Sequence, residues 1–136
     1  MYYEDIKIGD VFKSNLKKII TGTEIDLIAQ ISGLDHPNFL DPERAKQYGF
    51  KDRVVPGPYI MLCMLGLMLK QGFLSDALFV YVEEIRFKKP LFPGDSLSVE
   101  IDVTGKKESR KGGGSIIYNW KVLNQNDDIV AVGINH

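Results

Sequence analysis

The sequence predicts an α+β fold in which a curved antiparallel β-sheet wraps around one central apolar α-helix. Residues 59–69 carry no charged or amide side chain, and a helix that is apolar all round must be covered on most of its sides. Residues 96–104 alternate apolar with polar side chains, which is the period of a half-buried strand. In a chain of 136 residues, only a sheet that curls around the helix supplies that cover.

The first half of the chain is predicted to be mostly helical. Thr23 is expected to cap a helix that stops at Gly33, since Thr accepts hydrogen bonds at an N-cap and Gly suits the C-terminal end. Pro37 predicts a loop, because proline does not continue a helix. Asp41, followed by a proline, predicts the start of another short helix. The expected elements are a strand at 10–20, a helix at 24–32, a loop at 34–40, a helix from 41 to near 49 and the central helix at 58–71.

The second half of the chain is predicted to supply the sheet. Three consecutive glycines at 112–114 predict a hairpin turn, and the polar run 124–128 predicts a second turn. Because successive strands are joined by short turns, we expect an antiparallel meander. The expected strands lie at 78–88, 96–104, 115–123 and 129–134.

Composition and charge indicate one ordinary globular domain over residues 1–136. Lys and Arg number 17 against 18 Asp and Glu, a net charge of −1, which excludes nucleic-acid binding or a polybasic membrane anchor as the global theme. The longest uncharged stretch, 54–69, is shorter than the roughly 20 residues of a spanning helix, so we expect no membrane insertion and a cytoplasmic protein. Cys63 is the only cysteine, and no Cys/His cluster has zinc spacing, so no metal site is expected.

Three stretches carry a resemblance to a known family. Residues 32–45 read S-G-L-D-H-P-N-F-L-D-P-E-R-A, beside a family motif written S/T-G-D-x-N-P-x-H-x-D-x-x-x-A. Residues 54–57 are similar to the glycine-bearing start of that family's central helix, and residues 85–97 are similar to its R-F-x-x-P-x-x-x-G-D-x-L strand pair. In this order the chain resembles the MaoC-like dehydratases and (R)-specific enoyl-CoA hydratases, and the resemblance implies the hotdog fold.

The two catalytic positions of the family motif are substituted in this chain. The family's catalytic Asp falls on Leu34 and its His on Phe39, and neither side chain transfers a proton. A carboxyl and an imidazole group stand close by in the chain, at Asp35 and His36. Two interpretations remain open: Asp35 and His36 form a rebuilt proton-transfer pair, or they are loop residues that satisfy local backbone N–H groups.

The resemblance implies a reaction and its requirements. The reaction is the reversible hydration of a 2-enoyl thioester of coenzyme A or acyl carrier protein, with no metal or redox cofactor. Asp35 and His36 are the candidates for moving the proton, and a backbone N–H at the start of the central helix is expected to hold the thioester oxygen as it gains negative charge. Because Pro58 lacks an N–H, Gly57 or Tyr59 must supply that donor.

Three other functions fit the same residues. Leu34 and Phe39 favour a non-catalytic acyl-CoA-binding protein, such as a partner subunit beside an active relative. Alternatively, Asp35 activates water toward the carbonyl carbon, as in a hotdog acyl-CoA thioesterase, which releases free thiol where a hydratase does not. The third alternative is a pure interaction module.

A homodimer is expected on two grounds. The outer strands of a curved sheet lack partners within one chain, and the apolar helix needs cover on its open side. The resemblance implies that two hotdogs pair their sheets and build an acyl tunnel between them, beside Gly57 and with residues 34–39 near the partner.

Overall fold

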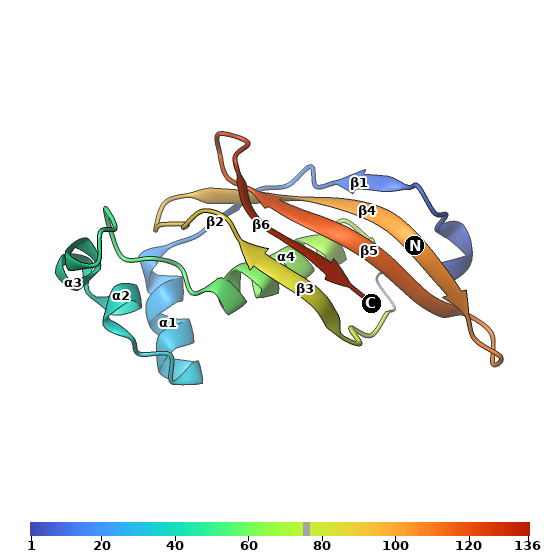
Figure 1. Ribbon diagram of the computed structural model, residues 1–136, viewed down its shortest axis with the longest axis horizontal. Helices are drawn as coiled ribbons and strands as arrows, with labels where there is room; N and C mark the ends of the chain where they lie inside the picture. The colour runs from blue at the N-terminus through green and yellow to red at the C-terminus, as the bar shows by residue number, and fades with distance from the viewer. Residues whose placement is uncertain (75–76) are drawn as a thin grey trace.

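The computed structural model describes residues 1–74 and 77–136. Its helices are η1 (Tyr3–Asp5), α1 (Gly22–Ser32), α2 (Pro37–Leu40), α3 (Pro42–Gln47) and α4 (Gly57–Lys70). Its strands are β1 (Val11–Lys13), β2 (Lys18–Ile19), β3 (Val82–Phe87), β4 (Ser96–Glu108), β5 (Gly114–Leu123) and β6 (Ile129–Asn135). The strands form one curved sheet with α4 along one face, and α1, α2 and α3 gather beyond one end of it (Figure 1).

Every strand pair in the described chain is antiparallel, in the order β1-β4-β5-β6-β3, with β2 also paired to β4. The predicted meander is confirmed for β4, β5 and β6. It is wrong for β3, which pairs with β6 instead of β4, because the segment 88–95 carries the chain from the edge strand β3 past β6 and β5 to β4. The last strand, β6, therefore has a partner on each side.

The first strand predicted at 10–20 is two short strands. Ser14 donates its N–H to the Val99 carbonyl, 2.9 Å away, while its own hydroxyl accepts the Val99 N–H at 2.9 Å. The side chain thus replaces one backbone partner, and regular pairing stops at Lys13. Pairing resumes at Lys18, which lies opposite Leu97.

Helix α1 begins earlier than the sequence predicts. Thr21, not Thr23, is the N-cap: its hydroxyl accepts the Glu24 N–H at 3.2 Å, and the Glu24 carboxylate accepts the Thr21 N–H at 3.3 Å. This reciprocal pair is a capping box, which satisfies two backbone donors at once. Gly33 ends the helix with φ +80°, as predicted.

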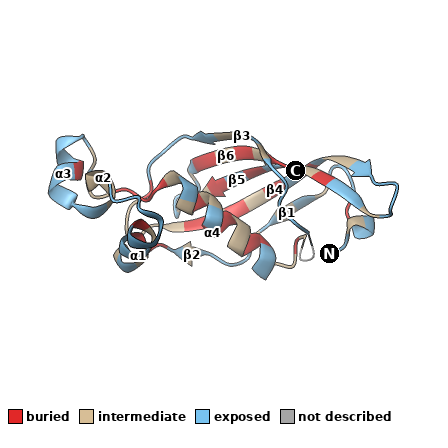
Figure 2. Cartoon of the chain, turned by 90° about the horizontal axis from the view of Figure 1, so that it is seen from below, coloured by how far each residue is buried: buried red, intermediate tan, exposed pale blue. Residues whose placement is uncertain are grey.

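The core lies between α4 and the sheet, as Figure 2 shows by the red segments on both. The predicted apolar face of β4 is buried throughout: Leu97, Val99, Ile101 and Val103. The helix itself is covered on one side only. Its buried residues are Ile60, Cys63, Met64, Leu67 and Met68.

The opposite face of α4 is open in the single chain. Leu62 is 53% exposed and Leu69 58%, so the sheet covers less of this apolar helix than the sequence predicts. Among the described residues, none of the helices is both long and apolar enough to cross a bilayer.

Candidate functional site

The segment 34–40, predicted as a loop, contains the short helix α2. Pro37 occupies its first turn, where a missing N–H costs nothing, and His36 is its N-cap. The His36 Nδ1 accepts the Asn38 N–H at 3.1 Å. Proline therefore starts a helical turn here, which is why the loop prediction fails.

The capping hydrogen bond determines which ring nitrogen of His36 carries the hydrogen. A neutral imidazole that accepts at Nδ1 holds its hydrogen on Nε2, so this ring offers a donor to its surroundings. Its ring lies 5.9 Å from that of Phe39 and 6.1 Å from that of Tyr48, centroid to centroid. Asp35 is exposed and has no hydrogen-bond partner among the described residues, so its carboxylate is open to accept. Two residues adjacent in the sequence thus offer an acceptor, the Asp35 carboxylate, and a donor, the His36 Nε2–H.

The substituted family positions behave as apolar residues. Leu34 is 38% exposed, and Phe39 packs against the hydrophobic core as a partly buried side chain. Neither carries a group that exchanges protons. Asp35 and His36 are the neighbouring residues in this segment that can exchange protons.

A backbone bond joins this segment to the start of α4. The Val54 N–H donates to the Asn38 carbonyl at 2.9 Å, and the Val55 N–H donates to the Leu91 carbonyl at 2.9 Å. The Asn38 N–H also donates to His36, so hydrogen bonds connect the imidazole through Asn38 to the segment before α4. This link reaches Val54, three residues before Gly57.

Gly57 offers the open donor at that terminus. The Tyr59 N–H bonds to the Pro56 carbonyl at 3.0 Å, and Pro58 has no N–H. Of the two donors the sequence predicts, Gly57 alone has no acceptor in the described chain. An N–H at the positive end of a helix dipole is suited to an oxygen that gains negative charge. A Cβ at Gly57 would lie 2.7 Å from Phe87 Cζ, so that ring stands directly against the glycine.

The Tyr59 side chain belongs to a polar cluster on the next turn. Burial, followed by hydrogen bonding and charge from Cys63 and Glu24, raises the pKa of Tyr59 well above its usual range. Glu24 also pairs with Lys18, Oε1 to Nζ, at 2.5 Å. Burial likewise raises the pKa of the Cys63 thiol, which keeps it protonated and unreactive. Tyr59 is therefore a neutral phenol that lines the cavity of about 560 Å³ beside α4.

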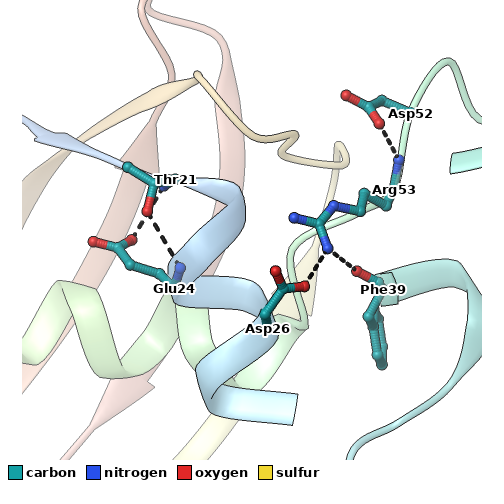
Figure 3. A network of polar contacts seen from close by, with 6 residues as sticks. All are labelled: Thr21, Glu24, Asp26, Phe39, Asp52 and Arg53. Atoms are coloured by element: carbon teal, nitrogen blue, oxygen red, sulfur yellow. Dashed lines mark hydrogen bonds and ion pairs between the residues drawn. The ribbon is translucent and has the colours of Figure 1, made fainter. Parts of the chain in front are cut away.

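Arg53 is a residue that sequence reasoning missed. Its Nη1 lies 2.5 Å from the Asp26 carboxylate on α1 and donates to the Phe39 carbonyl at 3.4 Å (Figure 3). The side chain is only 14% exposed. Arg53 therefore ties α1, α2 and the segment leading to α4 together. A lone arginine between charged loop residues gives no sequence signal of this role.

Three cavities border the described chain, and none is lined by Asp35, His36 or Gly57. The two larger ones, of about 680 and 560 Å³, flank α4. The described residues also contain no group of three or more His, Cys, Asp or Glu that could hold a metal ion.

Comparison with known proteins identifies the family. A model of the MaoC-like domain matches residues 5–121. The chain belongs to this family. An (R)-specific enoyl-CoA hydratase of Rhodospirillum rubrum is 30% identical over 119 residues, which cover 81% of this chain and 74% of that protein.

Solved structures confirm the hotdog fold of this MaoC-like domain. A monoamine oxidase regulatory protein from Archaeoglobus fulgidus superposes with a TM-score of 0.87 at 27% identity, over 99% of this chain and 91% of that one. A MaoC-like dehydratase from Rhodospirillum rubrum gives 0.86 at 24% identity, over 99% and 93%. The family is one of hydratases and dehydratases.

Proposed function

We propose that this MaoC-like domain catalyses the reversible hydration of a 2-enoyl thioester, carried by coenzyme A or acyl carrier protein, to the 3-hydroxyacyl thioester. One observation carries the proposal. The segment with Asp35 and His36 is hydrogen-bonded through Asn38 to Val54, in the segment that leads to Gly57. The Gly57 N–H has no acceptor among the described residues. Proton-transfer groups and an oxyanion donor therefore belong to one connected unit. The hydratase named among the relatives supports the same chemistry.

Each residue has a distinct role in this reaction. The Asp35 carboxylate takes a proton from water as the oxygen attacks the β-carbon of the enoyl group. The neutral His36 ring positions the attacking water through its Nε2–H, and the Asp35 carboxylic acid then returns the proton to the α-carbon, so both side chains end in their starting state. The Gly57 N–H holds the thioester oxygen while the enolate forms. The reaction adds water and moves protons only, so it needs no metal or redox cofactor.

The acting unit is proposed to be a homodimer. The uncovered face of α4 exposes Leu62 and Leu69. A second copy would cover that face and close the substrate tunnel. An isologous pair buries the same surface on both copies.

Hydration of enoyl-CoA tests the proposed reaction. The purified protein should consume crotonyl-CoA or a longer enoyl-CoA, with loss of the conjugated thioester's ultraviolet absorbance. Asp35→Asn and His36→Ala should each lower the rate at least about 100-fold, the range expected for losing an acid or base. Glu43→Gln, an exposed carboxylate change on α3, is the matched control and should leave the rate unchanged. Full activity in both site variants would mean that other groups move the proton.

A second function, acyl-thioester binding without catalysis, is favoured by Leu34 and Phe39. Assays of binding and of catalysis on the same protein preparation distinguish the two functions. Non-hydrolysable acyl-CoA should raise the melting temperature under either one, by mass action. Binding without loss of enoyl absorbance supports the non-catalytic protein, and release of free thiol supports a thioesterase. No melting shift at concentrations near millimolar would remove every thioester function.

A further inference from the structure

A cavity of about 560 Å³ lies between α4 and the segment 16–19, which includes strand β2. Cys63, Gly66 and Leu67 of α4 line it, and none of these three residues borders the larger cavity. Strand β2 pairs with β4 at the edge of the sheet opposite to β3, and Figure 2 shows the two strands on opposite sides of α4. The cavity therefore lies at the edge of the sheet away from β3.

Polar contacts hold the segment 16–19 beside the cavity at both of its ends. At one end, the Asn15 N–H donates to Gln71 Oε1 at 3.1 Å, just beyond the last turn of α4. At the other end, Lys18 is paired with Glu24 of α1. The cavity walls are thus tied to the rest of the fold, as in a preformed ligand site.

Gly66 leaves open space beside the middle of α4. Glycine in a helix interior is destabilising relative to alanine. A Cβ at Gly66 would meet no atom of the surrounding structure within 4 Å, so packing in the described chain does not require a glycine here. A residue that weakens the helix and enlarges a cavity is explained if a ligand occupies the space.

Two exposed lysines give this cavity a positive charge. Its lining residues include Lys17, Lys18 and Lys70, and no Asp or Glu. Glu24 neutralises Lys18, whereas Lys17 and Lys70 have no side-chain hydrogen bond or ion pair among the described residues. Most of the other lining side chains are apolar. An apolar molecule with an anionic group complements both properties.

We propose that this cavity binds an amphipathic anion, with an apolar body against Gly66 and Leu67 and one anionic head beside Lys17 and Lys70. Carboxylate and phosphate heads share this chemistry. Apolar walls with a few placed polar groups are the usual composition of a small-molecule site. The inference goes beyond the hydration reaction and does not rest on it.

A single NMR signal reports on this cavity. Cys63 is the only cysteine, so selective isotope labelling of cysteine gives one backbone amide signal, and Cys63 lines this cavity but not the larger one. At least one of octanoate and octyl phosphate should shift the signal, and the tighter binder identifies the anionic head. Octanol, which has the same chain and no charge, should bind about threefold more weakly or worse, as the loss of exposed ion pairs predicts.

Two sets of variants separate the charge from the space. Lys17→Gln with Lys70→Gln should weaken binding of the anion about three- to tenfold and leave octanol binding unchanged. Lys107→Gln with Lys121→Gln removes two exposed lysines of β4 and β5, and this charge-matched control should change neither affinity. Gly66→Leu should abolish the shift and keep the melting temperature at or above that of the wild type, because leucine favours helix.

Four results would overturn the proposal. The first is no shift with either anion, which is expected if a second copy of the chain fills the cavity. The others are equal affinities for octanol and the anions, equal losses in the two lysine pairs, and unchanged binding or a lower melting temperature in Gly66→Leu.

Discussion

A missing Cβ at Gly57 shapes the start of α4. The glycine leaves room for the Phe87 ring, whose Cζ would lie 2.7 Å from an added Cβ. Contacts this short do not occur, so a side chain at this position must push the ring away. The residue whose backbone N–H the proposed reaction uses therefore packs its α-carbon against an aromatic ring from β3.

Gly57→Ala should lower the free energy of unfolding by about 1–3 kcal/mol, the usual cost of overpacking. The matched background is Phe87→Leu, which lacks the three ring atoms nearest to the added methyl group. In that background the same change should cost little, because alanine favours helix. Urea unfolding of all four proteins gives the coupling between the two sites. Equal costs in both backgrounds would show that the ring does not set the choice of glycine.

The sequence predicts the candidate residues of the site, but not the hydrogen bonds that those residues make. It predicted Gly57 as one of two candidate donors, and only the Tyr59–Pro56 hydrogen bond separates the two. It placed Asp35 and His36 together, but not the capping bond that sets the imidazole tautomer. A proline followed by Asn, Phe and Leu starts a helical turn only when the preceding residue supplies a cap, and His is an unusual one.

At the scale of elements, Arg53 decides how α1 and α2 sit at the end of the sheet. One guanidinium nitrogen reaches both the Asp26 carboxylate and the Phe39 carbonyl. Gly22 lies against the same guanidinium, so a side chain there would require the end of Arg53 to shift. A planar, forked cation matches these partners, and a lysine does not.

Arg53→Lys should lower the free energy of unfolding by about 1–2 kcal/mol, because the charge remains while the directed hydrogen bonds are lost. Amide hydrogen exchange in residues 34–40 should accelerate, since α2 loses its tie to α1. Arg44→Lys, an exposed arginine on α3, is the control and should change neither measurement. Identical exchange in the two variants would contradict the positioning role.

Regular strands were predictable, and their interruptions were not. The alternation that predicts 96–104 is a local signal, and all four apolar residues are buried. The strand continues to Glu108 through a register shift between Val103 and Gly105, and irregular pairing of this kind carries no alternating pattern. The pairing of β3 with β6 likewise depends on contacts between segments distant in the sequence. Short turns between neighbouring strands do not predict it.

At the scale of the molecule, two apolar surfaces stay open. One is the face of α4 with Leu62 and Leu69. The other follows the edge strand β3 and the residues before it, where Phe79, Tyr81 and Phe87 are each nearly half exposed. Soluble proteins rarely leave an unpaired strand edge beside exposed aromatic rings.

Sedimentation at micromolar concentration should give twice the chain mass of 15.3 kDa. Leu62→Lys, which places a charge on the open face of α4, should shift the protein toward monomer. Asn126→Lys is the control, because Asn126 is exposed in the turn between β5 and β6 and belongs to neither apolar surface. A wild-type monomer across the concentration range would contradict both the dimer and a site built from two chains.

The order in which the strands pair has a consequence during synthesis. Strand β6 lies between β5 and β3, and because it follows both of them in the sequence, it leaves the ribosome after them. Until Ile129–Asn135 emerges, β3 has no partner and its aromatic neighbours stay in contact with water. The nascent chain therefore completes its sheet in one late step, and during that interval β3 is the segment most exposed to chaperones and to misassociation.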